Sequence, residues 1–296
     1  MNRQDGDHPW VVWMPAVFVL IWSTGFIVAR YGMPHSPPFT FLEMRFAFSL
    51  LCFGIWIWAS KAAWPTDRRQ WLHLAVTGSL MHTGYLGGVW AAVKMGMGAG
   101  LSALIVGLQP VLTGLWLSSQ GGKVRPIQWL GLILGFIGLC LVLLQKVQTT
   151  SEVSIWAMCS ASVALLSITA GTLYQKRYVL PCDVRTANFI QLSAAALMAL
   201  PWMLAEQEAV QWVPEFWAAM AWSVLGLTLG GSSLLYLLIQ RGAAASVSSL
   251  MYLVPPCTTI IAWLLFDELI TSVTLLGIAM AAIGVGLVTR QPQTVK

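Results

Sequence analysis

Charged residues are scarce in this chain. Only 9% of its 296 residues are Asp, Glu, Lys or Arg, whereas a soluble domain carries about 25%. Because 57% of the residues are apolar and the mean hydropathy is +0.74, most of the surface must face something other than water. The composition therefore predicts an integral membrane protein and excludes an ordinary soluble domain.

Several motifs that would carry chemistry are also missing. The chain contains no G-x-x-x-x-G-K-[ST], H-E-x-x-H or G-x-S-x-G sequence, which argues against a nucleotide-driven pump, a zinc protease and a serine hydrolase. The five cysteines have no metal-ligand spacing and the four histidines are scattered. We therefore expect no catalytic residue, metal or cofactor, and a membrane-embedded enzyme remains a remote alternative.

What the chain does contain is a series of long apolar windows. A helix needs about 20 apolar residues to cross a bilayer, and the window lengths with their lack of strict alternation exclude a barrel. The connections between windows are too short for a soluble domain. Ten windows qualify: 11–29, 40–59, 71–93, 99–118, 127–145, 153–173, 187–204, 216–239, 244–266 and 273–289.

The sequence repeats itself with an offset of 146 residues. Twelve of the 47 positions in 96–142 are identical at 242–288, without a gap. This divides the chain into a first repeat, 1–147, and a second repeat, 148–296. Since each repeat contains five windows, an odd number, the second copy enters the membrane from the opposite side. The expected fold is an all-α integral membrane protein of ten transmembrane helices, arranged as two inverted five-helix repeats.

Lysine and arginine are concentrated in alternate connections. With a cytoplasmic N-terminus, the cytoplasmic segments hold twelve of these residues and the outer loops three. Cytoplasmic loops of membrane proteins carry this excess, so both termini are predicted to be cytoplasmic. The same bias explains the net charge of +5 without a nucleic-acid partner.

Polar and aromatic residues at depth are candidates for lining a transport cavity. His82 is the only titratable residue at the centre of a window, and it shares a helix stripe with Ser79 and Tyr85. A neutral histidine bonded to a nearby carbonyl or hydroxyl is the alternative. Trp22 and Ser23 combine a flat apolar ring with a hydroxyl, although simple helix packing explains them equally well. The remaining candidates are Thr24, Phe26, Gln109, Ser162, Thr169, Tyr236 and Tyr252.

Two further groups of residues could control access to such a cavity. Pro110, Pro255 and Pro256 fall near the middle of two windows, where they predict either a flexible hinge or a static kink. Glu43 and Arg45 lie near one end of the second window. They are candidate gate charges, and snorkelling toward the membrane surface is the alternative interpretation.

Several short motifs occur in a fixed order: Trp22–Phe26 (WSTGF), Arg45-Phe46, Ser102 and Pro110 with Ser248 and Pro256, and Asp267-Glu268 followed by Gly277. In this order they resemble the EamA-type branch of the drug/metabolite transporter superfamily. The first repeat departs from the pattern, because Gly122 stands where the second has Glu268. The resemblance implies a transporter of a bacterial inner membrane with a central cavity lined by both repeats. Its bacterial members export amino acids and other metabolites, and the aromatic amino-acid exporters are the subgroup we expect.

A mainly neutral cavity suits an apolar or zwitterionic solute better than a polyanion. The leading hypothesis is therefore a gradient-driven secondary transporter that exports small metabolites, most of all amino acids, by alternating access. Other metabolites or cationic drugs are the alternative substrates. The expected partners are a small-molecule substrate and membrane lipid. The glycine pairs spaced four apart predict close helix packing and are not evidence for a dimer, so a monomer is expected.

Overall fold

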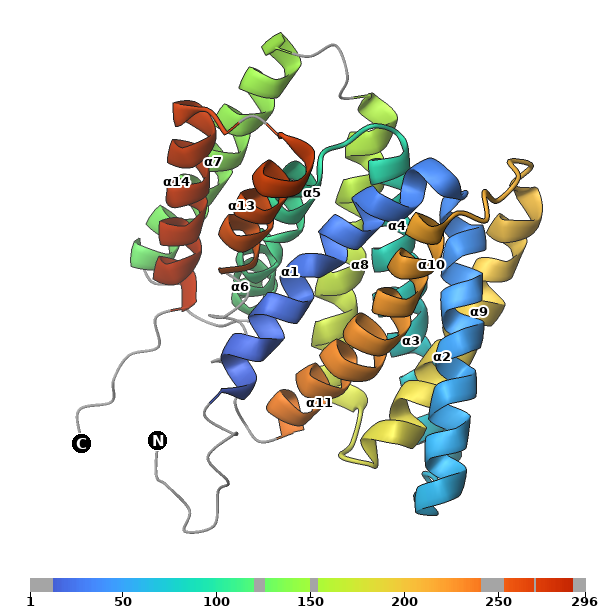
Figure 1. The fold of residues 1–296 in the computed structure, drawn as a ribbon. Helices are drawn as coiled ribbons and strands as arrows, with labels where there is room; N and C mark the ends of the chain where they lie inside the picture. The colour runs from blue at the N-terminus through green and yellow to red at the C-terminus, as the bar shows by residue number, and fades with distance from the viewer. Residues whose placement is uncertain (1–12, 120–125, 150–153, 241–252, 269, 290–296) are drawn as a thin grey trace, which may run out of the picture.

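The part of the chain that the structure describes is mostly helical. The computed structural model describes residues 13–119, 126–149, 154–240, 253–268 and 270–289, and no strand occurs among them. The helices pack side by side into one bundle, and several of them run from one end of the bundle to the other (Figure 1). This arrangement confirms the all-α class that the composition predicts.

The described part of the first half supplies nine helical elements. They are α1 (Met14–Gly32), the 3-10 turn η2 (Met33–His35), α2 (Pro38–Ser60), α3 (Arg68–Gly78), the π-helix η3 (Ser79–Gly84), α4 (Tyr85–Lys94), α5 (Ala99–Val106), α6 (Gln109–Ser119) and α7 (Pro126–Thr149).

The described part of the second half follows the same plan. Its elements are α8 (Ile155–Tyr178), α9 (Val184–Ala205), α10 (Pro214–Ala221), the π-helix η4 (Trp222–Ser232), α11 (Ser233–Gln240), α13 (Val254–Phe266) and α14 (Ser272–Thr289).

Six helical runs in the described chain are long and apolar enough to cross a membrane. They are Met14–His35, Pro38–Ser60, Ala99–Trp116, Ile155–Tyr178, Val184–Ala205 and Pro214–Leu235. Each falls on one of the predicted windows. The windows beginning at 127, 244 and 273 contain shorter apolar helices. The window 71–93 is helical through α3, η3 and α4, but its polar residues keep it out of the apolar set.

Local sequence sets where the helices begin and end. α2 begins with Pro38 in its first turn, where a missing N–H costs nothing, and it ends at Lys61 in a left-handed conformation with φ 51°. α3 and α9 begin after Asp67 and Asp183, whose carboxylates accept from the backbone N–H two residues later. The Asp183 cap therefore helps to set the residue at which α9 begins.

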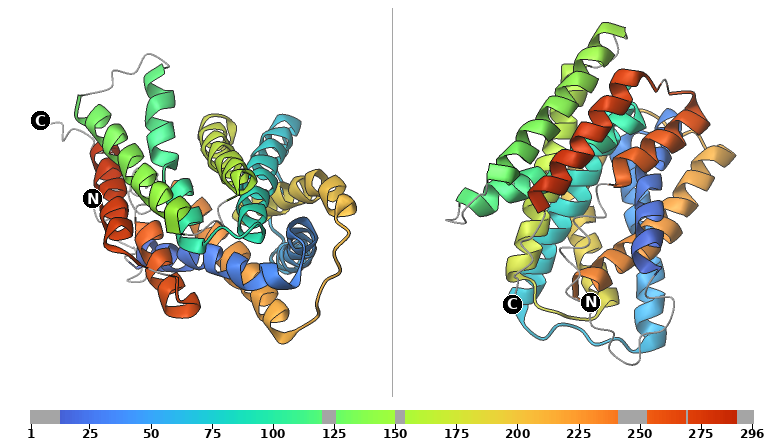
Figure 2. Two further views of the ribbon diagram at one scale, coloured as in Figure 1. Left: turned by 90° about the horizontal axis from the view of Figure 1, so that it is seen from above. Right: turned by 90° about the vertical axis from the view of Figure 1, so that its left-hand side faces the viewer.

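Helices related by the repeat lie side by side and run in opposite directions. α2 packs against α9, and α7 packs against α14 at one edge of the bundle (Figures 1 and 2). At this edge Gly138 meets the Gly277 backbone and Gly284 meets the Gly131 backbone. A Cβ on Gly138 or Gly284 would lie 2.5 or 2.4 Å from the opposing carbonyl oxygen. Both crossings therefore need glycine, and the two contacts are copies of each other at the 146-residue offset.

Aromatic side chains fill the core between the halves near the α1–α2 connection. The Phe41 ring lies 4.5 Å from the Trp90 ring and 5.4 Å from the Phe216 ring, measured between centroids. All three side chains are almost completely buried. Because aromatic side chains of this size remove a large apolar area from solvent, this cluster joins α2, α4 and α10 firmly at that end.

Two carboxylates of the second half hold the N-termini of first-half helices at the same end. Glu206 accepts from the backbone N–H groups of Phe39 and Thr40, at 2.9 and 2.7 Å, at the start of α2. Glu268 accepts from the N–H of Ala99, at 2.9 Å, at the start of α5. The first N–H groups of a helix lack intrahelical partners and favour negative charge, so both contacts stabilise the junction of the halves.

The opposite end of the bundle joins the halves through uncharged acceptors. The Gln70 side chain donates to the Leu180 carbonyl at 2.7 Å and accepts from the Leu180 N–H at 3.1 Å. The His73 ring bonds to the Tyr174 hydroxyl at 2.9 Å. No carboxylate takes part in a described contact between the halves at this end.

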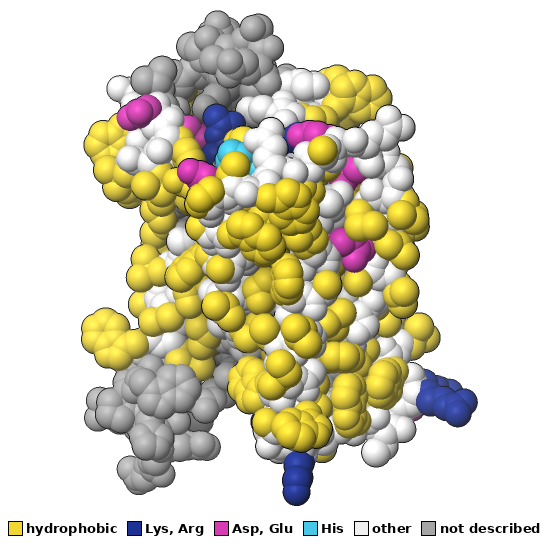
Figure 3. Space-filling view, turned by 45° about the vertical axis from the view of Figure 1, so that its right-hand side comes forward, with side chains coloured by type: hydrophobic (Ala, Val, Ile, Leu, Met, Phe, Trp, Pro, Cys, Tyr) yellow, Lys and Arg dark blue, Asp and Glu magenta, His cyan; other side chains and the backbone are white. Residues whose placement is uncertain are grey.

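The flank of the bundle is mostly apolar, and most charged groups lie toward its ends. Hydrophobic side chains cover most of the visible face, the acidic groups lie in its upper half, and lysine or arginine appears at both ends (Figure 3). Among the exposed residues are large side chains such as Trp58, Trp156 and Leu197. An exposed apolar belt of this kind fits a lipid surrounding.

Candidate functional site

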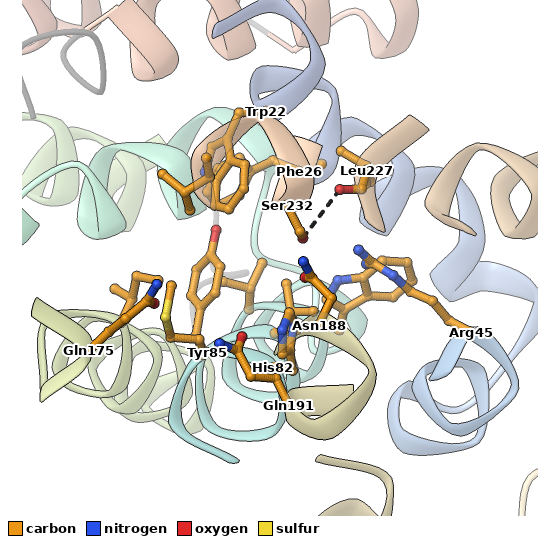
Figure 4. Close-up of a pocket in the computed structure, with 17 residues that line it drawn as sticks. Trp22, Phe26, Arg45, His82, Tyr85, Gln175, Asn188, Gln191, Leu227 and Ser232 are labelled. Atoms are coloured by element: carbon orange, nitrogen blue, oxygen red, sulfur yellow. Dashed lines mark hydrogen bonds between the residues drawn. The ribbon is translucent and has the colours of Figure 1, made fainter. Parts of the chain in front are cut away.

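A pocket lies between the two halves of the chain. The space open to the centre of a water molecule is about 60 Å³, room for roughly four to six waters. Apolar and aromatic side chains dominate the wall, with a few polar groups pointing inward (Figure 4). The lining residues are Trp22, Gly25, Phe26, Arg45, Met81, His82, Tyr85, Leu86, Val89, Trp90, Ile168, Gln175, Asn188, Gln191, Leu227, Ser232 and Leu235.

The lining repeats at the same offset as the sequence. We call two residues 146 positions apart repeat partners. The lining contains five pairs of repeat partners, so each half contributes the same five positions to the pocket. These pairs are Trp22 and Ile168, Arg45 and Gln191, Met81 and Leu227, Leu86 and Ser232, and Val89 and Leu235.

Arg45 is the charged group of the pocket. Its side chain is only 5% exposed, and its Nε donates to the Thr228 hydroxyl oxygen at 3.0 Å. The Thr228 hydroxyl in turn donates to the Ser223 carbonyl at 2.9 Å, so its lone pair is oriented toward Arg45. The snorkelling interpretation is wrong for Arg45, because the side chain turns inward to η4 of the other half. Its role as a gate stays a prediction.

Glu43 does not join Arg45, although the two are close in sequence. Residues two apart point to different faces of a helix, and Glu43 is absent from the lining. One of its carboxyl oxygens is buried and has no hydrogen-bond partner among the described residues. The structure therefore separates the two predicted gate residues.

The repeat partners of Arg45 and Thr228 face each other in the same way. These partners are Gln191 on α9 and His82 in η3, and the Gln191 side chain interacts with the His82 ring (Figure 4). His82 is 8% exposed and lines the pocket as predicted for a cavity residue. The same two contact positions are thus used twice, once with a guanidinium and once with neutral side chains.

Both of these contacts involve a π-helix. η3 covers Ser79–Gly84, and the offset carries this range onto residues 225–230, inside η4. A π-helix widens the turn and often marks a functional site. Ser79 lies in η3 but is not part of the lining. The two wide turns place His82 and Thr228 at equivalent positions beside the pocket.

Three of the predicted aromatic residues form one wall. Trp22, Phe26 and Tyr85 all line the pocket, and the Tyr85 hydroxyl interacts with the Trp22 side chain (Figure 4). Phe26 and Tyr85 are only 2% and 5% exposed. The wall offers broad apolar faces and one hydroxyl to a bound molecule.

Several predicted hydroxyl residues serve packing instead. The side chains of Ser23, Thr24 and Thr169 donate to backbone carbonyls three or four residues earlier in their own helices, at 2.6 to 2.7 Å. Thr24 also accepts from the Trp222 ring N–H at 2.8 Å. None of the three lines the pocket, so the packing alternative accounts for them.

Other candidates lie away from the pocket or outside the described chain. Gln109 donates to the Thr172 hydroxyl at 3.0 Å, a hydrogen bond that joins α6 to α8. Ser162 is exposed, because it lies on the outward face of α8. Tyr252 lies outside the described residues, as does the side chain of Tyr236.

The helix break that precedes Pro110 lies beside the other two predicted hinge prolines. α5 ends at Val106, and Pro110 follows in the first turn of α6. Pro255 and Pro256 occupy the first turn of α13, and a Cβ on Gly107 would lie 2.7 Å from the Pro255 ring. The helix break therefore packs against the start of α13. Whether it flexes stays a prediction.

Sequence reasoning missed four polar residues of the wall. Gln175, Asn188, Gln191 and Ser232 all line the pocket. Asn188 lies inside an apolar window, as does Gln191, and the 146-residue offset leads directly from Arg45 to Gln191. Following each inward polar residue to its repeat partner would have found Gln191 before the structure was known.

The sequence model of the EamA-like transporter family matches residues 8–144 and matches again at 155–290. The chain belongs to the EamA-like transporter family. Similar EamA relatives include the uncharacterized inner membrane transporter YedA of Escherichia coli K12, 24% identical over 93% of this chain and 89% of that protein. A probable amino-acid metabolite efflux pump of Salmonella typhimurium is 22% identical over 96% of this chain and 94% of that protein.

The fold of this EamA protein also occurs among solved structures. A crystal structure superposes with a TM-score of 0.69 at 19% sequence identity, covering 93% of this chain and 95% of the other. The family and the relative YedA are both named as transporters. The protein is thus a membrane transporter of the EamA family, with its pocket between the two halves.

Proposed function

We propose that this EamA protein is a secondary transporter that exports small metabolites by alternating access, with amino acids, including aromatic ones, as the leading substrates. The observation that carries the proposal is a pocket lined by five pairs of repeat partners. A site shared equally by two matching halves can face either side as the halves rock against each other.

The proposed architecture is ten transmembrane helices in two inverted repeats. The antiparallel packing of α2 with α9 and of α7 with α14 supports it, because inverted copies place equivalent helices in opposite directions. The paired glycine contacts at α7 and α14 support it further. Such repeats are common in secondary transporters.

Amino acids fit the character of the wall. Aromatic faces from Trp22, Phe26 and Tyr85 suit an apolar or aromatic side chain, and the inward polar groups suit a zwitterionic end. The relative named as an amino-acid metabolite efflux pump points the same way. Cationic drugs are the weaker candidate, since the described lining contains an arginine and no carboxylate.

Transport into liposomes tests the proposal. Purified protein in proteoliposomes should exchange labelled tryptophan, phenylalanine, methionine or threonine against the same amino acid inside, and protein-free liposomes should not. Ser162→Ala, on the exposed face of α8, should exchange like the unchanged protein. If none of the four moves while a sugar or a cationic drug does, the amino-acid assignment is wrong.

We also propose that both termini lie in the cytoplasm of a bacterial cell, with the membrane being the inner one. The excess of lysine and arginine in alternate connections supports this orientation. A fluorescent protein fused to the C-terminus should fold and fluoresce, and alkaline phosphatase inserted between α9 and α10 should be active. The reverse pattern would overturn the orientation.

A further inference from the structure

We propose that Arg45 is the carboxylate subsite of this pocket, and that its ligands are small molecules with one carboxylate, bound in one direction. This inference rests on the proposed transport function, because it specifies what the same pocket binds. It draws on the burial of Arg45, its unused donors, the absence of an acidic partner, and the neutral character of its repeat partner.

The first step is the state of the guanidinium. Arginine has five N–H donors in a planar fork, and the only hydrogen bond of Arg45 in the described chain is from Nε to Thr228. The four terminal N–H groups therefore have no protein acceptor there, although the side chain is 5% exposed and lines the pocket. A buried charge is costly unless it is paired, so these donors are available to a ligand.

The second step is the lack of a counter-charge. The described ion pairs of the chain are Lys94 with Glu208 and Arg185 with Asp183, and neither touches the pocket. Glu43, two residues from Arg45, makes no ion pair with it. One positive charge is matched by one carboxylate, which the fork of arginine can hold through two parallel bonds.

The third step is the difference between the repeat partners. Arg45 with Thr228 and Gln191 with His82 occupy equivalent positions, but only the first carries a guanidinium. A carboxylate is therefore held on the α2 side. Asn188 donates its side-chain N–H to the Val184 carbonyl at 2.8 Å, which leaves its carbonyl oxygen as the acceptor for an ammonium on the α9 side.

Matched ligands test the subsite without any variant. L-phenylalanine, L-phenylalaninamide and 3-phenylpropionate share one aromatic ring, but the amide lacks the carboxylate and the propionate lacks the ammonium. Binding of each to the purified full-length protein in detergent should rank both carboxylates above the amide, by roughly 10- to 100-fold for phenylalanine. Equal binding of acid and amide overturns the proposal, as does failure of every carboxylate to bind.

Arg45→Gln is the matched variant, because glutamine already occupies the repeat partner at Gln191. It should weaken phenylalanine and 3-phenylpropionate by roughly 10- to 100-fold and leave the amide within about threefold. Unchanged phenylalanine binding by a protein that elutes as the same single species overturns the subsite.

Thr228 acts as a positioning residue through Arg45. Thr228→Val removes the acceptor and should reduce the preference of acid over amide several-fold, whereas Thr228→Ser keeps the hydroxyl and should restore it. If Arg45→Gln fails to fold, this comparison carries the variant test. Equal preferences in the Val and Ser variants contradict the role of Thr228.

The outcomes separate this inference from the proposed function. If 3-phenylpropionate binds through Arg45 but no amino acid is bound or exchanged, the amino-acid assignment fails and the subsite stands. If amino acids are exchanged and Arg45→Gln leaves their binding unchanged, the function stands and the subsite fails.

Discussion

The contact between α7 and α14 gives a direct test of how closely the two halves approach. A Cβ at Gly284 would lie 2.4 Å from the Gly131 carbonyl oxygen and 2.6 Å from the Gly135 nitrogen. Real Cβ contacts below 3.0 Å essentially never occur, and ordinary contact begins near 3.4 Å. Gly284→Ala therefore forces the helices apart by about 1 Å, because the opposing atoms are backbone and close-packed interiors have no room to absorb it.

The cost of that separation exceeds what alanine contributes to the helix. Overpacking a close contact costs about 1 to 3 kcal/mol, and a backbone clash belongs at the upper end of that range. Alanine is better than glycine in a helix by about 1 kcal/mol. The net loss of about 2 kcal/mol corresponds to a fall in Tm of roughly 4 °C for a chain of this size.

Gly286 is the matched control on the same helix. A Cβ there would meet nothing within 4 Å, so Gly286→Ala should hold or raise the Tm. The measurement is the fraction of detergent-solubilised protein that still elutes as a single species after heating. A Gly284→Ala protein as stable as Gly286→Ala would refute the reasoning. Gly138→Ala, at the repeat partner, should match Gly284→Ala, and the double variant should lose less than the sum, since one separation relieves both clashes.

Three further predictions follow from contacts between the halves and at helix ends. Glu268→Ala removes the carboxylate that caps α5 and should cost about 1 kcal/mol, seen as a lower Tm; an unchanged Tm contradicts the cap. The Arg185 guanidinium holds the pKa of the Asp183 carboxyl below its ordinary value of 3.8, so the stability that this carboxylate contributes is present above that pH and is lost as the pH falls through the folded pKa. Asp183→Asn keeps a capping side chain but loses the charge, which should lower the stability by at most about 1 kcal/mol relative to the unchanged protein. The resulting difference in Tm should shrink between pH 5 and pH 3. A difference that stays constant over this range contradicts the linkage. Gly78→Ala places a Cβ 2.1 Å from the Gln191 carbonyl oxygen and should weaken both stability and ligand binding by shifting α9; normal binding in a stable protein would contradict that coupling.

The sequence indicated the general plan of the molecule because that plan depends on composition and periodicity. Scarce charge and long apolar windows predict membrane-length helices, and six of the windows contain them. The offset of 146 residues is a property of the sequence itself, and it reappears in the paired glycines Gly138 and Gly284. These features need no knowledge of which side chain faces which helix.

The site was harder to predict because side-chain direction depends on packing between distant segments. The position of Arg45 in its window predicts a residue at the membrane interface, yet its hydrogen-bond partner Thr228 lies 183 residues away in the sequence. The same limit explains why Ser23 and Thr24, which bond within their own helix, resemble cavity residues in sequence. His82 and Tyr85 were found because their helix stripe is the pocket wall. A π-helical turn such as η3 gives no clear periodic pattern in the sequence, so its position was not predicted.

The contacts between the halves differ in charge at the two ends of the bundle, because carboxylates take part at one end only among the described residues. Glu206 and Glu268 both belong to the second half, and both accept hydrogen bonds from N-terminal N–H groups of first-half helices. Separating the halves at this end breaks these bonds and exposes two carboxylates together with the N–H groups that they contact. Separating them at the other end breaks hydrogen bonds between uncharged groups, such as those of Gln70. Salt should therefore weaken the junction of the halves at this end of the bundle more than at the other end, so the two ends respond unequally to the ionic strength of the solution.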